Sequence, residues 1–330
     1  MRRVGRFLGR FLAIVALLLV GLWVFGPYED VDLKASFEPR KFGEGVQVYF
    51  ESIESGFTDI TPGTEKRVIW QPGFKEQRTP YSVLYVHGFS ATSQEIRPVP
   101  DRIADALGAN LVYTRLQGHG RGGAALATAS PSVWMRDLAE GLAAARAVGE
   151  QVVVISTSTG GTLVAAGLLD PEMAQNVVAS IFVSPNFGVN DPRAFLMTWP
   201  AARYWVPLLL GGEYSSETTD PQVAKFWTTT YPWSALPPMG VLVNKVAGLD
   251  FSGVTTPALF WFSKDDRVVR PDITQQIADR WGGPATVQTV TMGPGDDPNS
   301  HVIAGDIRSP GQTGSAVSGM LAWLAQQGIE

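Results

Sequence analysis

Three short, continuously apolar segments constrain the fold more than any other feature of this sequence. They span residues 82–86 (SVLYV), 151–156 (QVVVIS) and 257–262 (PALFWF). Strands that lack polar residues at alternate positions are typically buried on both faces. Helical stretches at 98–107 and 131–147 lie between them. This alternation predicts an α/β fold, a mostly parallel sheet with helices on both of its faces.

Two earlier segments, 45–51 (GVQVYFE) and 66–71 (KRVIWQ), are also expected to be strands because they are rich in β-branched and aromatic residues. Residues 186–250 break the strand–helix rhythm and are rich in Pro, Trp, Tyr and Phe. A long aromatic insertion after a strand is typical of a lid over an apolar pocket. The alternative is that these aromatic side chains only pack a small helical subdomain.

The amino-terminal 26 residues have the pattern of a membrane-targeting segment. Residues 1–10 carry four arginines, and residues 11–26 form an unbroken apolar run. As a helix this run would extend about 24 Å, slightly less than the roughly 30 Å of a bilayer core. The small-residue cleavage site of a secretory signal is missing, because the run ends in bulky residues from Trp23 to Tyr28. We therefore expect an uncleaved signal anchor, a transmembrane helix, over 1–26, with secretion after cleavage as the alternative.

The charges that flank the span set its expected orientation. Arginines precede it and acidic residues follow it, which places the amino terminus in the cytoplasm and the remainder on the outer or periplasmic side. Residues 27–44 read as a polar connector. Residues 45–330 are long enough for one α/β domain that contains the insertion.

Composition argues against several classes of function. The net charge is −5, and because the first 30 residues contribute +2, the remaining 300 carry −7. An acidic body without clustered Lys and Arg does not favour nucleic acid as a partner. The chain has no cysteine and only three histidines, without a metal-binding spacing. We therefore expect no thiol nucleophile, no metal site and no cofactor.

The strongest local signal for chemistry is the segment VVVISTSTGGTL, residues 152–163. An apolar strand runs directly into a turn of small residues centred on Ser158, and a helical pattern follows. Such a turn exposes a nucleophilic oxygen beside the amides of a helix N-terminus. In the usual G-x-S-x-G pattern small residues flank the serine. Here Ser156 replaces the first glycine and Gly160 is the second, so we predict Ser158 as the nucleophile.

A second motif follows the strand at 82–86, which ends in His87-Gly88-Phe89. With these residues and the Ser158 turn, the chain resembles the α/β-hydrolase superfamily. More narrowly, it is similar to the lid-bearing branch of monoacylglycerol lipases, carboxylesterases and serine aminopeptidases. The resemblance covers roughly residues 65–325, the insertion excepted. It implies an α/β-hydrolase fold with a helical lid, and an oxyanion hole formed by the backbone amides of Phe89 and Thr159.

The chain resembles the same branch at two further places. One is the segment TRLQGHGRG, residues 114–122, which contains His119, and the other is the W-x-x-D pattern of Trp134 and Asp137. The resemblance implies that these residues, together with His87, organise the loops around the site rather than take part in the chemistry.

The other two members of a catalytic triad are expected in the order acid, then histidine. Asp266 follows the strand at 257–262 and begins the sequence D-R-V-V-R-P, which matches the family's triad acid, with Asp265 as the alternative. His301 lies on a polar loop rich in Gly and Pro, as a catalytic base requires. The simpler interpretation is that Asp266 caps the helix expected near Pro271 and that His301 is merely solvated.

A Ser–His–Asp triad specifies acyl transfer, not the substrate. The anchor and the aromatic insertion favour a carboxylic ester with an apolar acyl chain, such as a lysophospholipid or a monoacylglycerol. One alternative is a serine aminopeptidase, in which Glu213, Glu217 and Asp220 bind an α-ammonium group, unless these acids are simply solvated. Another is a non-catalytic, membrane-tethered binding protein on a hydrolase fold, which the unusual Ser156 would suit.

Overall fold

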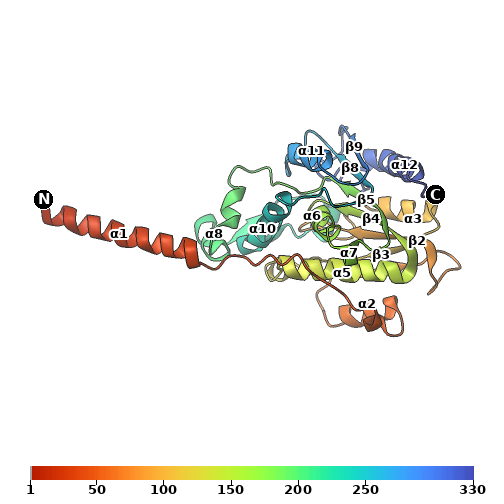
Figure 1. Ribbon diagram of the computed structural model, residues 1–330, viewed down its shortest axis with the longest axis horizontal. Coiled ribbons are helices and arrows are strands. Elements are labelled where there is room, and N and C mark those ends of the chain that lie inside the picture. The colour runs from red at the N-terminus through yellow and green to blue at the C-terminus, as the bar shows by residue number, and fades with distance from the viewer. Residues whose placement is uncertain (1) are drawn as a thin grey trace.

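The computed structural model describes residues 2–330, with side chains from Val4 onward, so Met1 of the predicted anchor lies outside it. Its centre is a seven-stranded sheet in the order β1-β3-β2-β4-β5-β8-β9 (Figure 1). Neighbouring strands run parallel, except that β1 is antiparallel to β3. The strands are β1 (Arg67–Ile69), β2 (Thr79–Val86), β3 (Asn110–Tyr113), β4 (Gly149–Thr157), β5 (Val177–Val183), β8 (Ala258–Phe262) and β9 (Ala285–Thr289).

The three apolar segments of the sequence form β2, β4 and β8, in the middle of the sheet. Alternate residues of β4 face opposite sides: Val152 and Val154 join one apolar cluster, whereas Val153 and Ile155 join the other. Helices α3 (Val99–Ala106) and α12 (Pro310–Gln326) cover the second cluster, and α5 (Pro131–Val148), α6 (Thr159–Gly167), α10 (Leu236–Ala247) and α11 (Pro271–Asp279) cover the first. The predicted parallel sheet with helices on both faces is confirmed.

The segment predicted as a strand at 45–51 is a helix instead, α2 (Val46–Glu54). Val46 and Phe50 lie four residues apart and are both buried, which is the spacing of a helix face rather than of a strand. The carboxylate of Glu54 accepts hydrogen bonds from the Arg115 guanidinium at 2.7 and 2.8 Å. The prediction was wrong because β-branched and aromatic content favours a strand only weakly, and packing overrides it. The second predicted strand, 66–71, is present as the shorter β1.

The insertion at 186–250 consists mainly of short helices. They are η2 (Ala194–Thr198), α8 (Ala202–Leu210), α9 (Pro221–Phe226), η3 (Trp233–Ala235) and α10. A small antiparallel ribbon, β6 (Glu213–Ser215) with β7 (Thr230–Pro232), was not predicted. Outside the insertion, the remaining short helices are η1 (Pro39–Phe42), α4 (Gly123–Leu126) and α7 (Pro171–Ala174).

Helix α1 (Arg2–Phe25) projects away from the globular part on the side of α8, opposite α12 (Figure 1). Within it, Val4–Phe25 is long and apolar enough to cross a bilayer, and none of it is buried. These are the properties of a membrane anchor or of a signal sequence. The helix ends against the insertion: the rings of Trp23 and Trp199 are 5.7 Å apart, and the Ala201 N–H donates to the Pro27 carbonyl at 2.7 Å.

Candidate active site

Ser158 stands at the point where β4 turns into α6. Its backbone has φ 51° and ψ −120°, a conformation that non-glycine residues rarely adopt. The turn holds because the Ser158 N–H donates to the Val183 carbonyl at 3.0 Å and its carbonyl accepts from the Asn186 N–H at 3.0 Å. Strand and helix come so close that a Cβ on Gly160 would lie 2.3 Å from the Val86 carbonyl oxygen. The turn therefore presents the Ser158 hydroxyl at the carboxyl edge of the sheet.

Ser156 occupies the position of the first glycine in the usual motif. Its side chain is fully buried, and its hydroxyl donates to the Ile181 carbonyl of β5 at 3.4 Å. A serine hydroxyl is thus accommodated beneath the turn without displacing Ser158.

His301 and Asp266 lie beside Ser158, although the three residues come from distant parts of the chain. His301 Nε2 is 3.0 Å from Ser158 Oγ, and His301 Nδ1 is 2.8 Å from Asp266 Oδ2. The other carboxylate oxygen of Asp266 accepts from the Val268 and Val269 N–H groups at 2.8 and 2.9 Å. Because a carboxylate only accepts, it holds the proton on Nδ1 and leaves Nε2 able to accept the serine proton.

The neighbouring aspartate, Asp265, is exposed, and His301 Nδ1 bonds to Asp266 instead. Asp266 does not cap α11 either, since that helix begins at Pro271 and its N-cap residue is Arg270. Of the two acids left open by the sequence, Asp266 is the one that contacts the histidine.

The charge of Asp266 sets the proton affinity of His301. Burial lowers the pKa of the imidazole, but the adjacent Asp266 carboxylate outweighs this effect and raises the pKa above its ordinary value. The Asp266 carboxylate therefore makes His301 a stronger base than an isolated imidazole in the same buried position.

Two backbone amides near Ser158 are available to an anionic oxygen. The Phe89 N–H has no hydrogen-bond acceptor within residues 2–330, and Thr159 is the first residue of α6, where helical N–H groups lack partners within the helix. Phe89 and Thr159 thus lie on two segments next to Ser158, the loop after β2 and the first turn of α6.

The surroundings of the other two histidines, His87 and His119, indicate a structural role. His87 Nε2 accepts from the Leu116 N–H at 3.1 Å, its Nδ1 donates to the Gly88 carbonyl at 2.9 Å, and burial lowers its pKa to about 4. The His119 ring packs 4.8 Å from that of His87, and burial keeps its pKa well below the usual range. Both rings are therefore neutral and hold loops together.

The W-x-x-D residues of α5 hold the same loops. The Trp134 indole donates to the Gln117 carbonyl at 3.0 Å, and the Asp137 carboxylate accepts from the Gln117 N–H at 2.7 Å. These contacts fix the segment that contains His119.

Residues 83–304, more than half of the chain, match the family model described as the alpha/beta hydrolase family. The chain belongs to the α/β-hydrolase family. None of the curated proteins compared with it matches.

Solved structures share the fold of this hydrolase at low sequence identity. A structure reported for LipS and LipT, two metagenome-derived lipolytic enzymes, has a TM-score of 0.65 at 18% identity and covers 81% of this chain and 99% of its own. A soluble variant of monoglyceride lipase from Saccharomyces cerevisiae has a TM-score of 0.58 at 12% identity and covers 80% and 91%. Monoacylglycerol lipase from Paleococcus ferrophilus has a TM-score of 0.52 at 13% identity and covers 80% of this chain and 99% of its own.

Two acidic residues of the hydrolase site were not predicted from its sequence. Asp297 Oδ2 accepts from the backbone N–H groups of His301 and Val302 at 3.1 and 2.9 Å, and Oδ1 accepts from Arg308 at 2.5 Å. Asp297 thus fixes the loop that carries the histidine, and the D-P-N-S turn just before His301 is the signal that could have indicated it. The other acid, Glu95, lies in the segment after β2, where the sequence offers no such signal.

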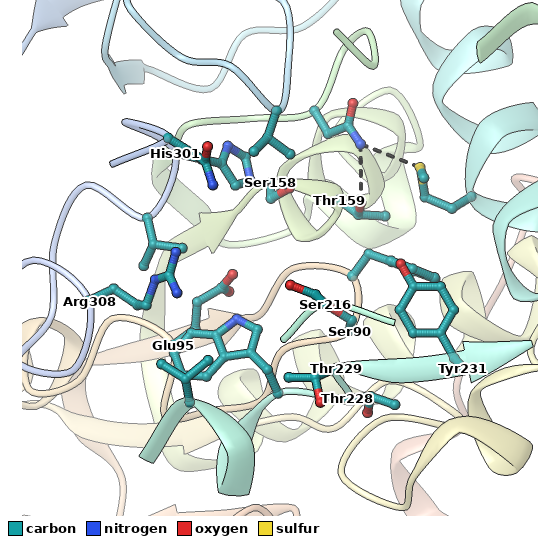
Figure 2. Close-up of a pocket in the computed structure, with 18 of the residues that line it drawn as sticks. Ser90, Glu95, Ser158, Thr159, Ser216, Thr228, Thr229, Tyr231, His301 and Arg308 are labelled. Carbon is teal, nitrogen blue, oxygen red and sulfur yellow. Dashed lines mark hydrogen bonds between the residues drawn. The ribbon is translucent and has the colours of Figure 1, made fainter. Parts of the chain in front are cut away.

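A cavity of about 360 Å³ opens over Ser158 and His301 (Figure 2). One part of its wall comes from the sheet edge and the other from the insertion, which contributes Tyr214, Val223, Tyr231, Leu236 and Met239. The three acids that the sequence suggested for an aminopeptidase are elsewhere. Glu213 and Glu217 are exposed, Asp220 caps α9 through two backbone N–H groups, and none of the three lines the cavity.

Proposed function

We propose that this hydrolase cleaves carboxylic esters with an apolar acyl group, with Ser158 as nucleophile, His301 as base and Asp266 as its acid. The observation that carries the proposal is the hydrogen-bonded chain from Ser158 Oγ through His301 to Asp266, at 3.0 and 2.8 Å, beneath a mainly apolar cavity. Nucleophile, base and orienting acid in this order are the requirements of acyl transfer.

The mechanism proceeds in two halves. Ser158 Oγ attacks the ester carbonyl while His301 Nε2 takes its proton, and the Phe89 and Thr159 N–H groups stabilise the oxyanion. His301 then gives the proton to the departing alcohol, which leaves an acyl-serine. Water, deprotonated by His301, attacks the acyl-serine and releases the carboxylic acid. Asp266 keeps the imidazole in the required tautomer and stabilises its charged form in both halves.

The surroundings of the anchor support an ester that derives from a membrane lipid. Tyr204, Leu208 and Leu209 of α8 expose large apolar side chains beside the end of α1. The sequence between α8 and α10 lines the cavity. An apolar surface near the end of a membrane helix, on the same insertion that lines the cavity, suits an insertion that acts as a lid at the bilayer surface. In this proposal α1 remains attached, with its amino terminus in the cytoplasm and the hydrolase domain on the opposite side.

The deciding experiment compares the full chain in detergent micelles with its Ser158→Ala variant on p-nitrophenyl esters from acetate to palmitate. We expect turnover to fall by about 10⁵-fold or more in the variant, because only the oxyanion hole and substrate binding would remain. A fluorophosphonate probe should label Ser158 in the parent chain and not in the variant. Thr157→Ala, one residue away in the buried strand, is the matched control and should retain labelling.

The outcomes separate the rival functions. Turnover of esters that is lost with Ser158 supports the proposal, and the preferred chain length measures the acyl site. Labelling of Ser158 without turnover of any ester, but with release of amino-terminal residues from peptides, would replace the esterase with an aminopeptidase. Failure to label Ser158 at all would favour a non-catalytic binding protein.

A further inference from the structure

Glu95 is a buried carboxyl in the cavity that the proposed mechanism does not use. It lies between β2 and α3, and only 3% of the residue is exposed. Its Oε2 accepts hydrogen bonds from the Gly88 N–H at 2.7 Å and from the Tyr85 hydroxyl at 3.1 Å. One oxygen of the carboxyl is therefore committed to the loop that carries the Phe89 amide.

The second oxygen, Oε1, has no hydrogen-bond donor within the described side chains, residues 4–330. It lies close to the nucleophile, since a Cβ on Gly88 would stand 2.9 Å both from Glu95 Oε1 and from Ser158 Cβ. Figure 2 shows the Glu95 carboxyl in the cavity wall, on the same side as Arg308 and directed towards Ser158. Oε1 is not among the side-chain atoms shut off from solvent, and Glu95 lines the cavity, so a ligand there can reach Oε1 and supply the donor that the protein does not.

The protein does not supply a cation to this carboxyl. No Lys or Arg within residues 4–330 forms an ion pair with Glu95, and the guanidinium of Arg308, in the same cavity, pairs with Asp297 at 2.5 Å. Burial raises the pKa of Glu95 to about 7, although the hydrogen bond from the Gly88 N–H and, to a smaller extent, the nearby His301 act to lower it. The carboxyl is thus available either to an uncharged donor or to a cation.

The position of Glu95 identifies the part of the substrate that it would meet. Leu236 and Met239 make the wall beside the insertion apolar, whereas the wall beside His301 contains Glu95 and Arg308. The leaving oxygen must lie near His301 Nε2 to receive its proton, so the alcohol half of the ester belongs on the polar side. The acyl chain would then lie along the apolar wall of the cavity.

We propose that Glu95 Oε1 accepts a hydrogen bond from a donor on the alcohol half of the substrate, a hydroxyl or a protonated amine. The inference rests on the proposed function and narrows its substrate class. The substrate is then a partial ester of a diol or polyol, or an ester of an amino alcohol, rather than an ester of a simple alkyl alcohol.

The test uses decanoate esters that differ only in the alcohol. The 2-hydroxyethyl ester is compared with the propyl ester of similar shape, and the 2-(dimethylamino)ethyl ester with the 3-methylbutyl ester. kcat/KM is measured for the full chain, for Glu95→Gln, and for Asp265→Asn, which removes an exposed carboxyl near the site. We expect the full chain and Asp265→Asn to prefer at least one donor ester by about 10- to 100-fold. Glu95→Gln should reduce that preference to threefold or less.

The two donor esters show whether Glu95 binds a hydroxyl or an ammonium group. Preference for the amino ester that is lost in Glu95→Gln assigns an ammonium group, and the same result for the hydroxyethyl ester assigns a hydroxyl. Equal kcat/KM for donor and alkyl esters in the full chain would overturn the proposal. So would a Glu95→Gln variant that slows all four esters by the same factor, because that result would make Glu95 only an anchor for the Gly88 loop.

Loss of folding or of the nucleophile is controlled by fluorophosphonate labelling of Ser158, which Glu95→Gln should preserve. Absence of ester turnover together with absence of labelling in the parent chain would reject the proposed function itself, and this inference with it. Turnover of all four esters without a donor preference rejects the inference alone.

Discussion

The sheet edge around Ser158 and the α8 region of the insertion differ in the surroundings of their side chains. At the sheet edge, Ser158, His301 and Asp266 are almost fully buried, and each is held by hydrogen bonds to backbone or to one another. In α8, Leu208 is 84% exposed and Leu209 is 73% exposed. The first region is complete within the protein, whereas the second presents a clustered apolar surface that needs a partner outside it.

The two regions are therefore expected to affect function in different ways. Backbone geometry dictates the chemistry at the sheet edge, so a single substitution there removes an interaction that nothing else can replace. The α8 surface acts through area, and each of its side chains contributes only a part of the total. Large losses confined to the first region and graded losses in the second are therefore the expected pattern.

The largest effect after removal of the nucleophile is expected from Asp266→Asn. An amide in this position favours the wrong imidazole tautomer, so kcat should fall by roughly 10³- to 10⁴-fold on every ester. The pH profile supplies a second measurement. His301 is active when neutral, so activity is lost as the pH falls through its pKa, which Asp266 raises. The residual activity of the variant should therefore persist to lower pH. If the variant loses activity over the same acidic pH range as the parent chain, the titrating group is not His301. Glu95 would then be the next group to test.

An intermediate effect is expected from the double variant Leu208→Ser, Leu209→Ser. The full chain in phosphatidylcholine vesicles should hydrolyse a vesicle-borne decanoate ester about five- to tenfold more slowly, because the apolar area available to the bilayer is reduced. Turnover of soluble p-nitrophenyl acetate should not change. Val48→Ser, at an exposed apolar position on α2 away from α8, is the control. Equal losses on both substrates would mean that these leucines stabilise the insertion instead of contacting lipid.

The same contrast explains how much could be predicted from the sequence. The central strands were evident because β2, β4 and β8 are buried on both faces and read as apolar runs. The residues predicted as a triad do lie together, since a turn, a strand end and a loop recur in a fixed order, although their chemical roles remain predictions. Two adjacent aspartates on one loop could not be separated from sequence, because burial against His301 distinguishes Asp266 from Asp265.

The parts that could not be predicted depend on contacts between distant segments. The ribbon β6–β7 pairs two three-residue strands, too short to carry a period of their own. The fold alone places Glu95 against Gly88 and near Ser158, and brings Asp297 into contact with Arg308. In the insertion the aromatic content was visible, but the apolar surface of α8 beside the anchor became apparent only from its exposure in the fold.

The smallest effect is expected at the junction between the insertion and the segment that follows α1. Arg203 of α8 forms a two-point ion pair with Glu29 of the connector, at 2.7 and 2.8 Å, and also donates to the Ala127 and Ala129 carbonyls. Both partners are partly exposed, so the pair contributes about 1 kcal/mol or less.

Glu29→Gln should therefore slow hydrolysis of the vesicle-borne ester only about twofold, with soluble ester turnover unchanged. Arg203→Ala should cost more, because it also removes the two carbonyl contacts. In the double variant the Glu29 substitution should add nothing further if the pair acts as a unit, which a double-mutant cycle on the ratio of the two rates measures. Strict additivity would show that the charge pair is incidental to how the insertion meets the membrane. The position of α8 beside α1 would then be attributed to the packing of Trp23 against Trp199 and to the hydrogen bond from Ala201 to Pro27.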